Sequence, residues 1–188
     1  MLLSSSHLRT TRRRHHSRAG VSLIELLLTA TVFTIGIGAV ASSMVASRSL
    51  GNTVRETNRA LEVGQSAVES VKGEVFEEAF VRFNATAADD PALGDSPGNF
   101  FAARGLNLQV GDADGFVGEI LFPGDGVQLR EDFVDPELGM PRDLNGDGVV
   151  DAVDHSGDYN VLPIRVRLQW TGETGARSLD FVTLLAQP

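Results

Sequence analysis

The spacing of apolar residues changes along the chain and divides it into segments. From Leu26 to Ser47 the sequence runs for 22 residues without a charged residue or a proline. A helix of that length spans roughly 30 Å at about 1.5 Å per residue, enough to cross the hydrocarbon core of a bilayer. We therefore predict a leader over residues 1–20 and a transmembrane helix over residues 21–47.

After residue 47 the apolar residues recur at helical spacing. A seven-residue repeat is formed by Val54, Leu61, Val68 and Val75, and is flanked by Ala60, Ala67, Val71 and Ala79. The repeat predicts an amphipathic helix over residues 48–83. One helix, loosened at Gly36–Gly38 and Gly51, would then run from Val21 to Phe83. A homodimeric coiled coil would give the same repeat, but only four heptad positions are sustained, which favours packing on the chain's own sheet.

Residues 84–188 have the pattern of a small β domain. Prolines and glycines predict a surface connection over residues 84–105. Apolar patches bounded by Gly-Asp clusters predict short strands at Leu106–Val110, Phe116–Phe122 and Val127–Leu129.

The C-terminal residues predict an antiparallel hairpin. Apolar and polar residues alternate from Ile164 to Trp170, turn chemistry occupies Thr171–Gly175, and alternation resumes from Leu179 to Leu185. The expected fold class is α+β, with a long N-terminal helix, one half apolar and one half amphipathic, packed on this small C-terminal sheet. Trp170 is expected in the core.

The apolar segment has two unusual neighbours. Five arginines and no acid precede it, which predicts a cytoplasmic leader and an external C-terminal domain. Glu25 lies directly before the uncharged run, within the predicted transmembrane helix. A charge costs about 2.5–3.5 kcal/mol at the centre of a membrane helix and less near the interface. If the chain were cut after Gly20, the new amine of Val21 would lie four residues before Glu25, on the same helix face.

Two simpler interpretations of the segment do not require Glu25. One is a secretory signal with its small-residue cleavage site at Ala39–Ala41, and the other is an uncut membrane anchor. A twin-arginine signal is disfavoured, because the apolar residues expected directly behind the arginine pair are absent.

The arginine-rich leader, Gly20 and the run from Val21 to Glu25 resemble the class III signal of type IV pilins and pseudopilins. The resemblance covers about 30 residues and departs from the family pattern at Val21, where Phe is commonest. It implies that a prepilin peptidase cuts after Gly20 and methylates Val21. It also implies that Glu25 neutralises the amine of an adjacent subunit during assembly, with residues 21–47 in the filament core.

The resemblance further implies a minor pilin or pseudopilin of a type IV pilus or type II secretion-like filament. Its partners would be other pilin or pseudopilin subunits, the prepilin peptidase and an inner-membrane assembly platform. Before assembly the chain would lie in the inner membrane as a single-pass protein, with its C-terminal domain in the periplasm or outside. The alternative is a membrane-anchored or secreted calcium-binding adhesion module.

Charge and composition exclude several other functions. Without the leader, 11 basic side chains stand against 25 acidic ones, and residues 84–160 hold 16 acids and three bases. Such a surface repels nucleic acid and attracts cations, so no direct nucleic-acid partner is expected. There are no cysteines, and His155 is the only histidine after the leader, with no nucleophile-elbow motif near any serine. We therefore expect no enzyme.

A second motif lies at residues 143–154 and predicts a calcium loop. Oxygen-bearing side chains stand at places 1, 3, 5, 9 and 12, with a glycine at place 6 and a backbone carbonyl at place 7. The predicted ligands are Asp143, Asn145, Asp147, the carbonyl of Val149, Asp151 and Asp154. The spacing resembles the EF-hand loop, with aspartate at place 12 where glutamate is usual.

The surroundings of the loop differ from an EF-hand. Pro141 precedes it and a polar Gly-Asp stretch follows it, so flanking helices are not expected. A dockerin would need a second copy of the loop, and the sequence has none. An acidic, glycine-rich surface turn would show part of the same pattern. We expect a structural calcium ion that takes the place of a disulfide over residues 135–160, with His155 and Asp158 solvated.

Overall fold

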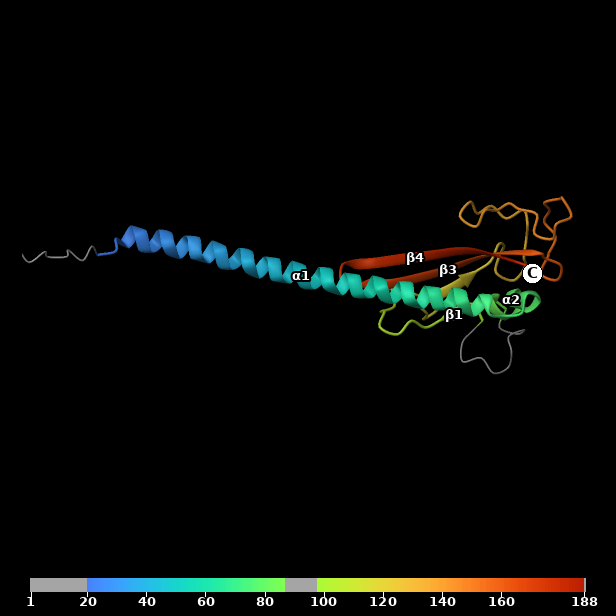
Figure 1. The fold of residues 1–188 in the computed structure, drawn as a ribbon, viewed down its shortest axis with the longest axis horizontal. Helices are drawn as coiled ribbons and strands as arrows, with labels where there is room; N and C mark the ends of the chain where they lie inside the picture. The colour runs from blue at the N-terminus through green and yellow to red at the C-terminus, as the bar shows by residue number, and fades with distance from the viewer. Residues whose placement is uncertain (1–19, 87–97, 188) are drawn as a thin grey trace, which may run out of the picture. The chain divides into compact units, whose positions relative to one another are not determined.

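The computed structural model describes residues 20–86 and 98–187. The predicted leader up to residue 19 and the connection at residues 87–97 lie outside the described residues. The elements, in chain order, are α1 Leu23–Lys72, α2 Phe76–Phe83, β1 Phe100–Phe101, β2 Gly118–Leu121, β3 Val161–Gly172 and β4 Gly175–Ala186 (Figure 1). The predicted α+β fold, with one long N-terminal helix and a C-terminal antiparallel sheet, is confirmed. The chain forms two compact units that divide after Val45.

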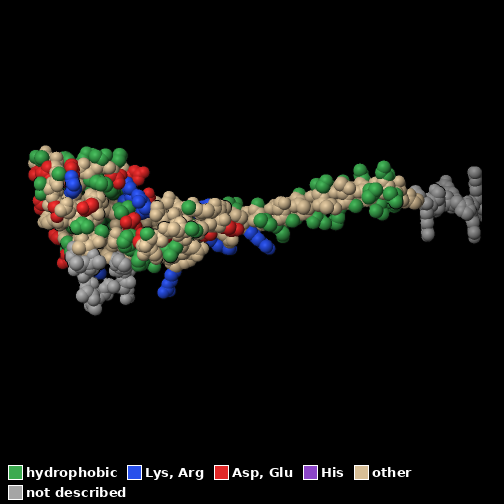
Figure 2. Space-filling model, turned by 180° about the vertical axis from the view of Figure 1, so that it is seen from behind, with side chains coloured by type: hydrophobic (Ala, Val, Ile, Leu, Met, Phe, Trp, Pro, Cys, Tyr) green, Lys and Arg blue, Asp and Glu red, His purple; other side chains and the backbone are tan. Residues whose placement is uncertain are grey.

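The first unit contains the N-terminal part of α1, which is apolar on every side. All its large hydrophobic side chains from Leu23 to Val45 are more than half exposed (Figure 2). Within α1, the most apolar 18-residue window has a mean hydropathy of 2.1. By length and composition, α1 can therefore cross a membrane, as a single-pass anchor requires.

Four hydroxyl groups in this part of α1 are bonded to the helix itself. Thr29, Thr31, Thr34 and Ser42 each donate a hydrogen bond of 2.7–2.9 Å to the carbonyl oxygen four residues earlier. These bonds lower the cost of placing the four hydroxyls in an apolar medium. The predicted loosening at Gly36–Gly38 and Gly51 is wrong, because α1 is a continuous helix through both positions.

In the second unit, α1 buries a narrow stripe of small residues. The buried residues are Ala60, Gly64, Val68 and Val71. They recur at intervals of three and four residues, the period of a straight helix that packs on a globular core. The predicted seven-residue repeat is wrong as the buried face at three of its four positions, because Val54, Leu61 and Val75 are exposed.

Gly64 is the point of closest approach between α1 and the sheet. A Cβ at this position would overlap the aromatic ring of Phe181 on β4. Figure 1 shows the corresponding half of α1 lying along β3 and β4. Glycine is therefore required here because the ring occupies the space of a side chain.

The predicted helix to Phe83 is interrupted after Lys72. Gly73 ends α1 with a hydrogen bond from its N–H to the Glu69 carbonyl (2.9 Å), and α2 begins at Phe76. The hydroxyl of Tyr159 donates to the Phe76 carbonyl (2.6 Å) and accepts from the Phe80 N–H (3.4 Å). Tyr159 thus fixes α2 to the segment that leads into β3.

The sheet is antiparallel with strand order β1-β2-β3-β4. The predicted hairpin is confirmed: β3 and β4 pair along their whole lengths, from Val161 opposite Ala186 to Gly172 opposite Gly175. The alternating apolar residues of β3 from Ile164 to Trp170 are buried, including Trp170 as predicted.

The shorter predicted strands are only partly present. Phe116–Phe122 contains β2, as expected, whereas Leu106–Val110 and Val127–Leu129 form no strand. They make single bridges instead, Asn107 to Thr171 and Leu129 to Gly124. The predicted connection at residues 84–105 contains β1 at its end. Gly-Asp turns on both sides leave these patches too short for a ladder.

The opposite face of β3 is covered by the acidic middle segment. Arg165 is buried there and lies 2.6 Å from Asp135 and 3.0 Å from Glu137. Because the central part of β3 is buried on both faces, the segment before residue 161 is held against the sheet.

We predict that Gly64→Leu destabilises the second unit by about 1–3 kcal/mol, because the added side chain must displace Phe181. Denaturant unfolding of the full chain in detergent micelles, followed by Trp170 fluorescence, measures the change. Gly51→Ala is the matched control, since a Cβ there meets no atom within 4 Å. It should stabilise the helix by about 0.5–1 kcal/mol. Equal stability of Gly64→Leu and the parent chain would contradict the packing.

Candidate cation-binding loop

The first half of the loop at residues 143–154 is wound around the side chain of Asp143. Its Oδ1 accepts a hydrogen bond from the Gly146 N–H (2.6 Å) and its Oδ2 accepts one from the Gly148 N–H (2.7 Å). Both glycines have positive φ, 82° and 86°, a conformation that glycine adopts without strain. The sharp turn expected at place 6 is therefore present.

The next two predicted ligands continue the same winding. Asn145 Oδ1 accepts from the Asp147 N–H (3.0 Å), and Asp147 Oδ1 accepts from the Val149 N–H (2.8 Å). The Asn145 amide also lies 3.4 Å from the second oxygen of Asp147. The structure thus brings Asp143, Asn145 and Asp147 together in one turn and leads the chain on to Val149.

The last two predicted ligands have other contacts. Asp151 Oδ1 accepts from the Val153 N–H (2.8 Å). Asp154 Oδ1 accepts from the N–H groups of Leu129 (3.0 Å) and Ser156 (3.1 Å). Asp154 therefore joins the end of the loop to a separate segment, and a cation at place 12 would compete with these bonds.

Glu131 holds the two halves of the loop together, and the spacing motif does not include it. Its side chain is 1% exposed. One oxygen accepts from the N–H groups of Leu144 (2.5 Å) and Asn145 (3.2 Å), and the other accepts from the Asp151 N–H (3.3 Å). The sequence carries no local signal for Glu131, because Val127–Leu129 forms no strand and Val127, two residues before the buried Leu129, is exposed.

His155 is buried, contrary to the prediction that it would be solvated. The residue is 4% exposed. Its Nδ1 lies 3.0 Å from Asp158 Oδ1, and its Nε2 lies 3.2 Å from Asp151 Oδ1 and 3.8 Å from Glu131 Oε2. Asp158 itself is exposed, as expected. The sequence signal for this cluster is the position of Asp151 four residues before His155 and of Asp158 three residues after it.

The surroundings of His155 perturb two pKa values. Burial alone would lower the pKa of His155, but hydrogen bonds to Asp151 and Asp158 and the charge of Glu131 outweigh burial and raise it. The Val153 N–H, followed by the hydrogen bond to His155, lowers the pKa of Asp151. The Asp151 carboxylate is therefore charged at neutral pH and able to bind a cation.

The loop is anchored to the start of β3. The N–H groups of Asn160 (2.8 Å) and Val161 (3.0 Å) both donate to the Leu144 carbonyl, and the Asn160 amide donates to the Asn145 carbonyl. A change in the loop would therefore act directly on the β3–β4 hairpin.

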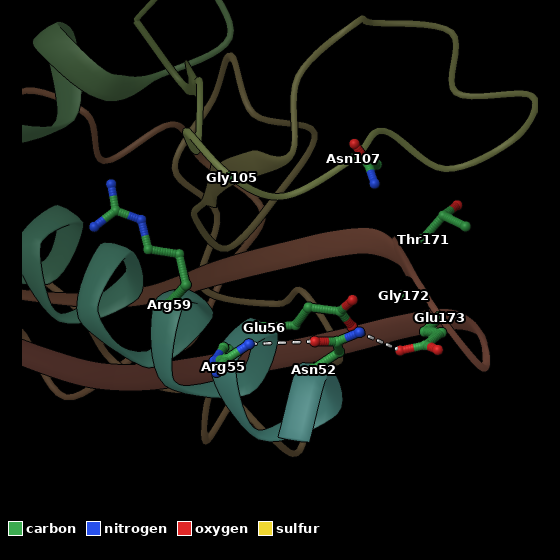
Figure 3. Close-up of a pocket in the computed structure, with 9 residues that line it drawn as sticks. All are labelled: Asn52, Arg55, Glu56, Arg59, Gly105, Asn107, Thr171, Gly172 and Glu173. Carbon is green, nitrogen blue, oxygen red and sulfur yellow. Dashed lines mark hydrogen bonds between the residues drawn. The ribbon is translucent and has the colours of Figure 1, made fainter. Parts of the chain in front are cut away.

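A separate hollow of about 550 Å³ lies between α1 and the tip of the hairpin (Figure 3). It is lined by Asn52, Arg55, Glu56, Arg59, Gly105, Asn107, Thr171, Gly172 and Glu173. The Asn52 amide donates to Glu173 (2.9 Å), which ties α1 to the turn. No histidine or lysine is among the described residues that line it, so it offers neither of these groups as a catalytic base.

Comparisons of the chain with known protein families, with curated proteins and with solved structures found no match. What the structure itself provides is a long N-terminal apolar helix, packed through its second half on a small antiparallel sheet. This is a pilin-like architecture.

We predict that Glu131→Ala destabilises the second unit by at least about 1–3 kcal/mol, the cost of one buried donor left without an acceptor. Three N–H groups lose their acceptor in this variant. Thermal unfolding of the full chain in micelles, monitored by circular dichroism, measures the loss. Glu78→Ala, at an exposed position on α2, is the control and should change stability by less than about 0.5 kcal/mol. Similar stability of both variants would show that Glu131 does not hold the loop.

Proposed function

We propose that this chain is a minor pilin or pseudopilin, a structural subunit of a type IV pilus or a type II secretion-like filament. The observation that carries the proposal is Glu25, a carboxylate in the first turn of α1. No other charged residue occurs in this helix before Arg48, and the large apolar side chains from Leu23 to Val45 are exposed. Such a surface needs lipid or other helices around it. A filament subunit would meet both environments in turn. It lies in the lipid of a membrane before assembly and against other helices after assembly.

The residues around the proposed cleavage point support processing by a prepilin peptidase. Gly20, Val21 and Ser22 precede the first helical residue and are exposed, so an enzyme can reach the Gly20–Val21 bond. Cutting there would place a positive amine close to the first turn of α1. Glu25 of a neighbouring subunit would then be the acid that neutralises it.

The regularity of α1 supports its use as a filament-core helix. A Cβ at Gly36 or Gly38 would meet no other atom within 4 Å, so neither glycine is explained by packing within the chain. Glycine in a helix interior costs about 0.5–1 kcal/mol relative to alanine. Close approach of another helix is a physical reason to accept that cost.

We also propose that the loop binds calcium and stabilises the external domain in place of a disulfide. The turn around Asp143 and the positive φ of Gly146 and Gly148 fit a backbone that wraps one ion, with oxygen donors from Asn145 and Asp147. Asp143 and Asp147 would supply negative charge, and the Val149 carbonyl would complete this half. Asp151 and Asp154 would have to exchange their present contacts for the ion.

The calcium loop also favours a second candidate, a membrane-anchored or secreted calcium-binding adhesion module. That module would share the anchor and the loop, but it has no use for an acid inside the apolar helix. Glu25 therefore discriminates between the two functions.

We predict that Glu25→Ala abolishes incorporation into filaments while membrane insertion is kept or improved. Removal of the acid leaves the amine of a neighbour without its counter-ion, and it relieves a cost of up to about 2.5–3.5 kcal/mol in the membrane. Immunoblots of sheared filaments and of membranes, from a host with the assembly machinery, measure both effects. Glu62→Ala, on the exposed face of the same helix, is the control and should assemble normally.

The mass of the membrane-bound protein completes this test. A start at Val21, with or without one added methyl group, is expected for the parent chain and for both variants. A start near Ser42 would indicate ordinary secretion. An uncut start at Met1, or normal filament incorporation of Glu25→Ala, would leave the adhesion module as the better function.

We predict that calcium raises the melting temperature of the second unit relative to a chelator. A ligand present at 100 times its Kd stabilises the folded state by about 2.7 kcal/mol. Calorimetric melts of the full chain in micelles, with calcium or with EGTA, provide the measurement. Asp147→Ala should remove the shift, because this residue holds the central place of the loop. An identical melting temperature in both buffers would refute the calcium proposal.

A further inference from the structure

A second cation site is suggested by the side chains around His155. Glu131 comes from the segment before the loop, and Asp151 and His155 come from the end of the loop. One ligand atom of each lies within 4.8 Å of the other two. The side chains of Glu131 and His155 are 1% and 6% exposed, whereas that of Asp151 is 40% exposed. The cluster is therefore buried on two sides and open to solvent on the third.

The hydrogen bonds of His155 determine which nitrogen faces the carboxylates with a lone pair. Both ring nitrogens face carboxylate oxygens, Nδ1 that of Asp158 at 3.0 Å and Nε2 that of Asp151 at 3.2 Å. A carboxylate only accepts hydrogen bonds, and a neutral ring has one proton to donate, so the shorter contact favours Nδ1 as the protonated nitrogen. The Asn145 amide lies farther from the same nitrogen, at 3.4 Å. In the neutral ring Nε2 then presents a lone pair to Asp151 Oδ1 and Glu131 Oε2.

Three electron-rich atoms facing one another in a buried place require a positive charge between them. Either a second proton on the ring or a metal ion can provide it. The separations from Nε2, 3.2 Å to Asp151 and 3.8 Å to Glu131, are close to the roughly 3.4 Å expected between neighbouring ligands of a tetrahedral ion with bonds of about 2.0–2.2 Å. The ligand atoms of Glu131 and Asp151 also lie within 4.8 Å of each other.

The donor set selects the type of ion. Calcium and magnesium take oxygen ligands, whereas one imidazole and two carboxylates suit zinc and similar divalent transition metals. The contact between Asp158 and Nδ1 matches the carboxylate that commonly orients a metal-bound histidine. Water can complete the coordination from the exposed side of Asp151.

We propose that Glu131, Asp151 and His155 bind a divalent transition metal of the zinc type, with Asp158 orienting the imidazole. The site does not depend on filament assembly. It shares Asp151 with the calcium loop, but Asp143, Asn145 and Asp147 take no part in it. An ion here would join the segment at residue 131 to the end of the loop.

Zinc titration of the full chain in detergent micelles tests the site. The leader histidines His7, His15 and His16 are replaced by alanine, so that His155 is the only histidine. Calorimetry should then show one zinc ion bound per chain, and the ring resonances of His155 should shift on zinc addition. Co²⁺ should give the visible spectrum of a tetrahedral site and be displaced by zinc.

Three variants distinguish this site from general acidity. Asp158→Asn should weaken zinc binding about 10–100-fold, the usual effect of losing an orienting carboxylate, and His155→Asn should weaken it further. Asp151→Asn, at a partly exposed position, should also weaken zinc binding, and it provides a second ligand variant if the buried His155→Asn fails to fold. Circular dichroism checks that each variant is folded.

The outcomes separate this proposal from the calcium proposal. Asp147→Ala should remove the calcium-dependent shift in melting temperature and leave zinc affinity within about twofold. His155→Asn should weaken zinc binding and leave the calcium-dependent shift in place. Equal zinc affinity of His155→Asn and its parent would overturn the site and indicate non-specific binding to acids. Unshifted His155 resonances at excess zinc would overturn it too, and would show that a proton alone balances the carboxylates.

Discussion

The structure depends on one constraint: the apolar part of α1 finds no cover within the described chain. Its large apolar side chains from Leu23 to Val45 are exposed, and four of its hydroxyls are already bonded to the helix backbone. Apolar surface of this extent is stable only in lipid or against other apolar helices. The second part of the same helix has the opposite requirement, because Gly64 must be small to admit Phe181. One part of this continuous helix thus leaves its apolar surface uncovered, and the other part packs on the chain's own sheet.

A buried carboxylate holds the loop of the second unit together without a disulfide. Glu131 accepts hydrogen bonds from both halves of the loop, and Arg165 fixes the next acidic turn to β3 through Asp135. Tyr159 then ties the segment after the loop to α2. These contacts are polar and converge on a short stretch, so removing one buried partner costs more than removing a surface ion pair. This physical arrangement gives the loop an effect on stability whether or not an ion is bound.

Sequence patterns predicted the elements whose residues repeat over a long distance. The hairpin followed from alternation between Ile164 and Trp170, and the long helix followed from an uninterrupted apolar run. Sequence patterns failed where a single tertiary contact determines which residues are buried or where a helix ends. The heptad from Val54 to Val75 has the right period for a coiled coil, but the sheet selects the smaller residues beside it. The break at Gly73 and the burial of His155 depend on segments distant in sequence, and no local spacing encodes them.

The acidity of the middle segment links the two cation proposals. Two basic side chains already have acidic partners: Arg130 in this segment pairs with Asp132 at 2.6 Å, and Arg165 on β3 pairs with Asp135 and Glu137. Among the described residues, no lysine or arginine lies within ion-pair distance of Asp143 or Asp147, whose carboxylates are held by N–H groups and an amide. Hydrogen bonds reduce the repulsion between neighbouring carboxylates but do not remove their charge. Under the two proposals, a cation from solution neutralises this loop, and the imidazole of His155 selects the kind of cation that Asp151 binds.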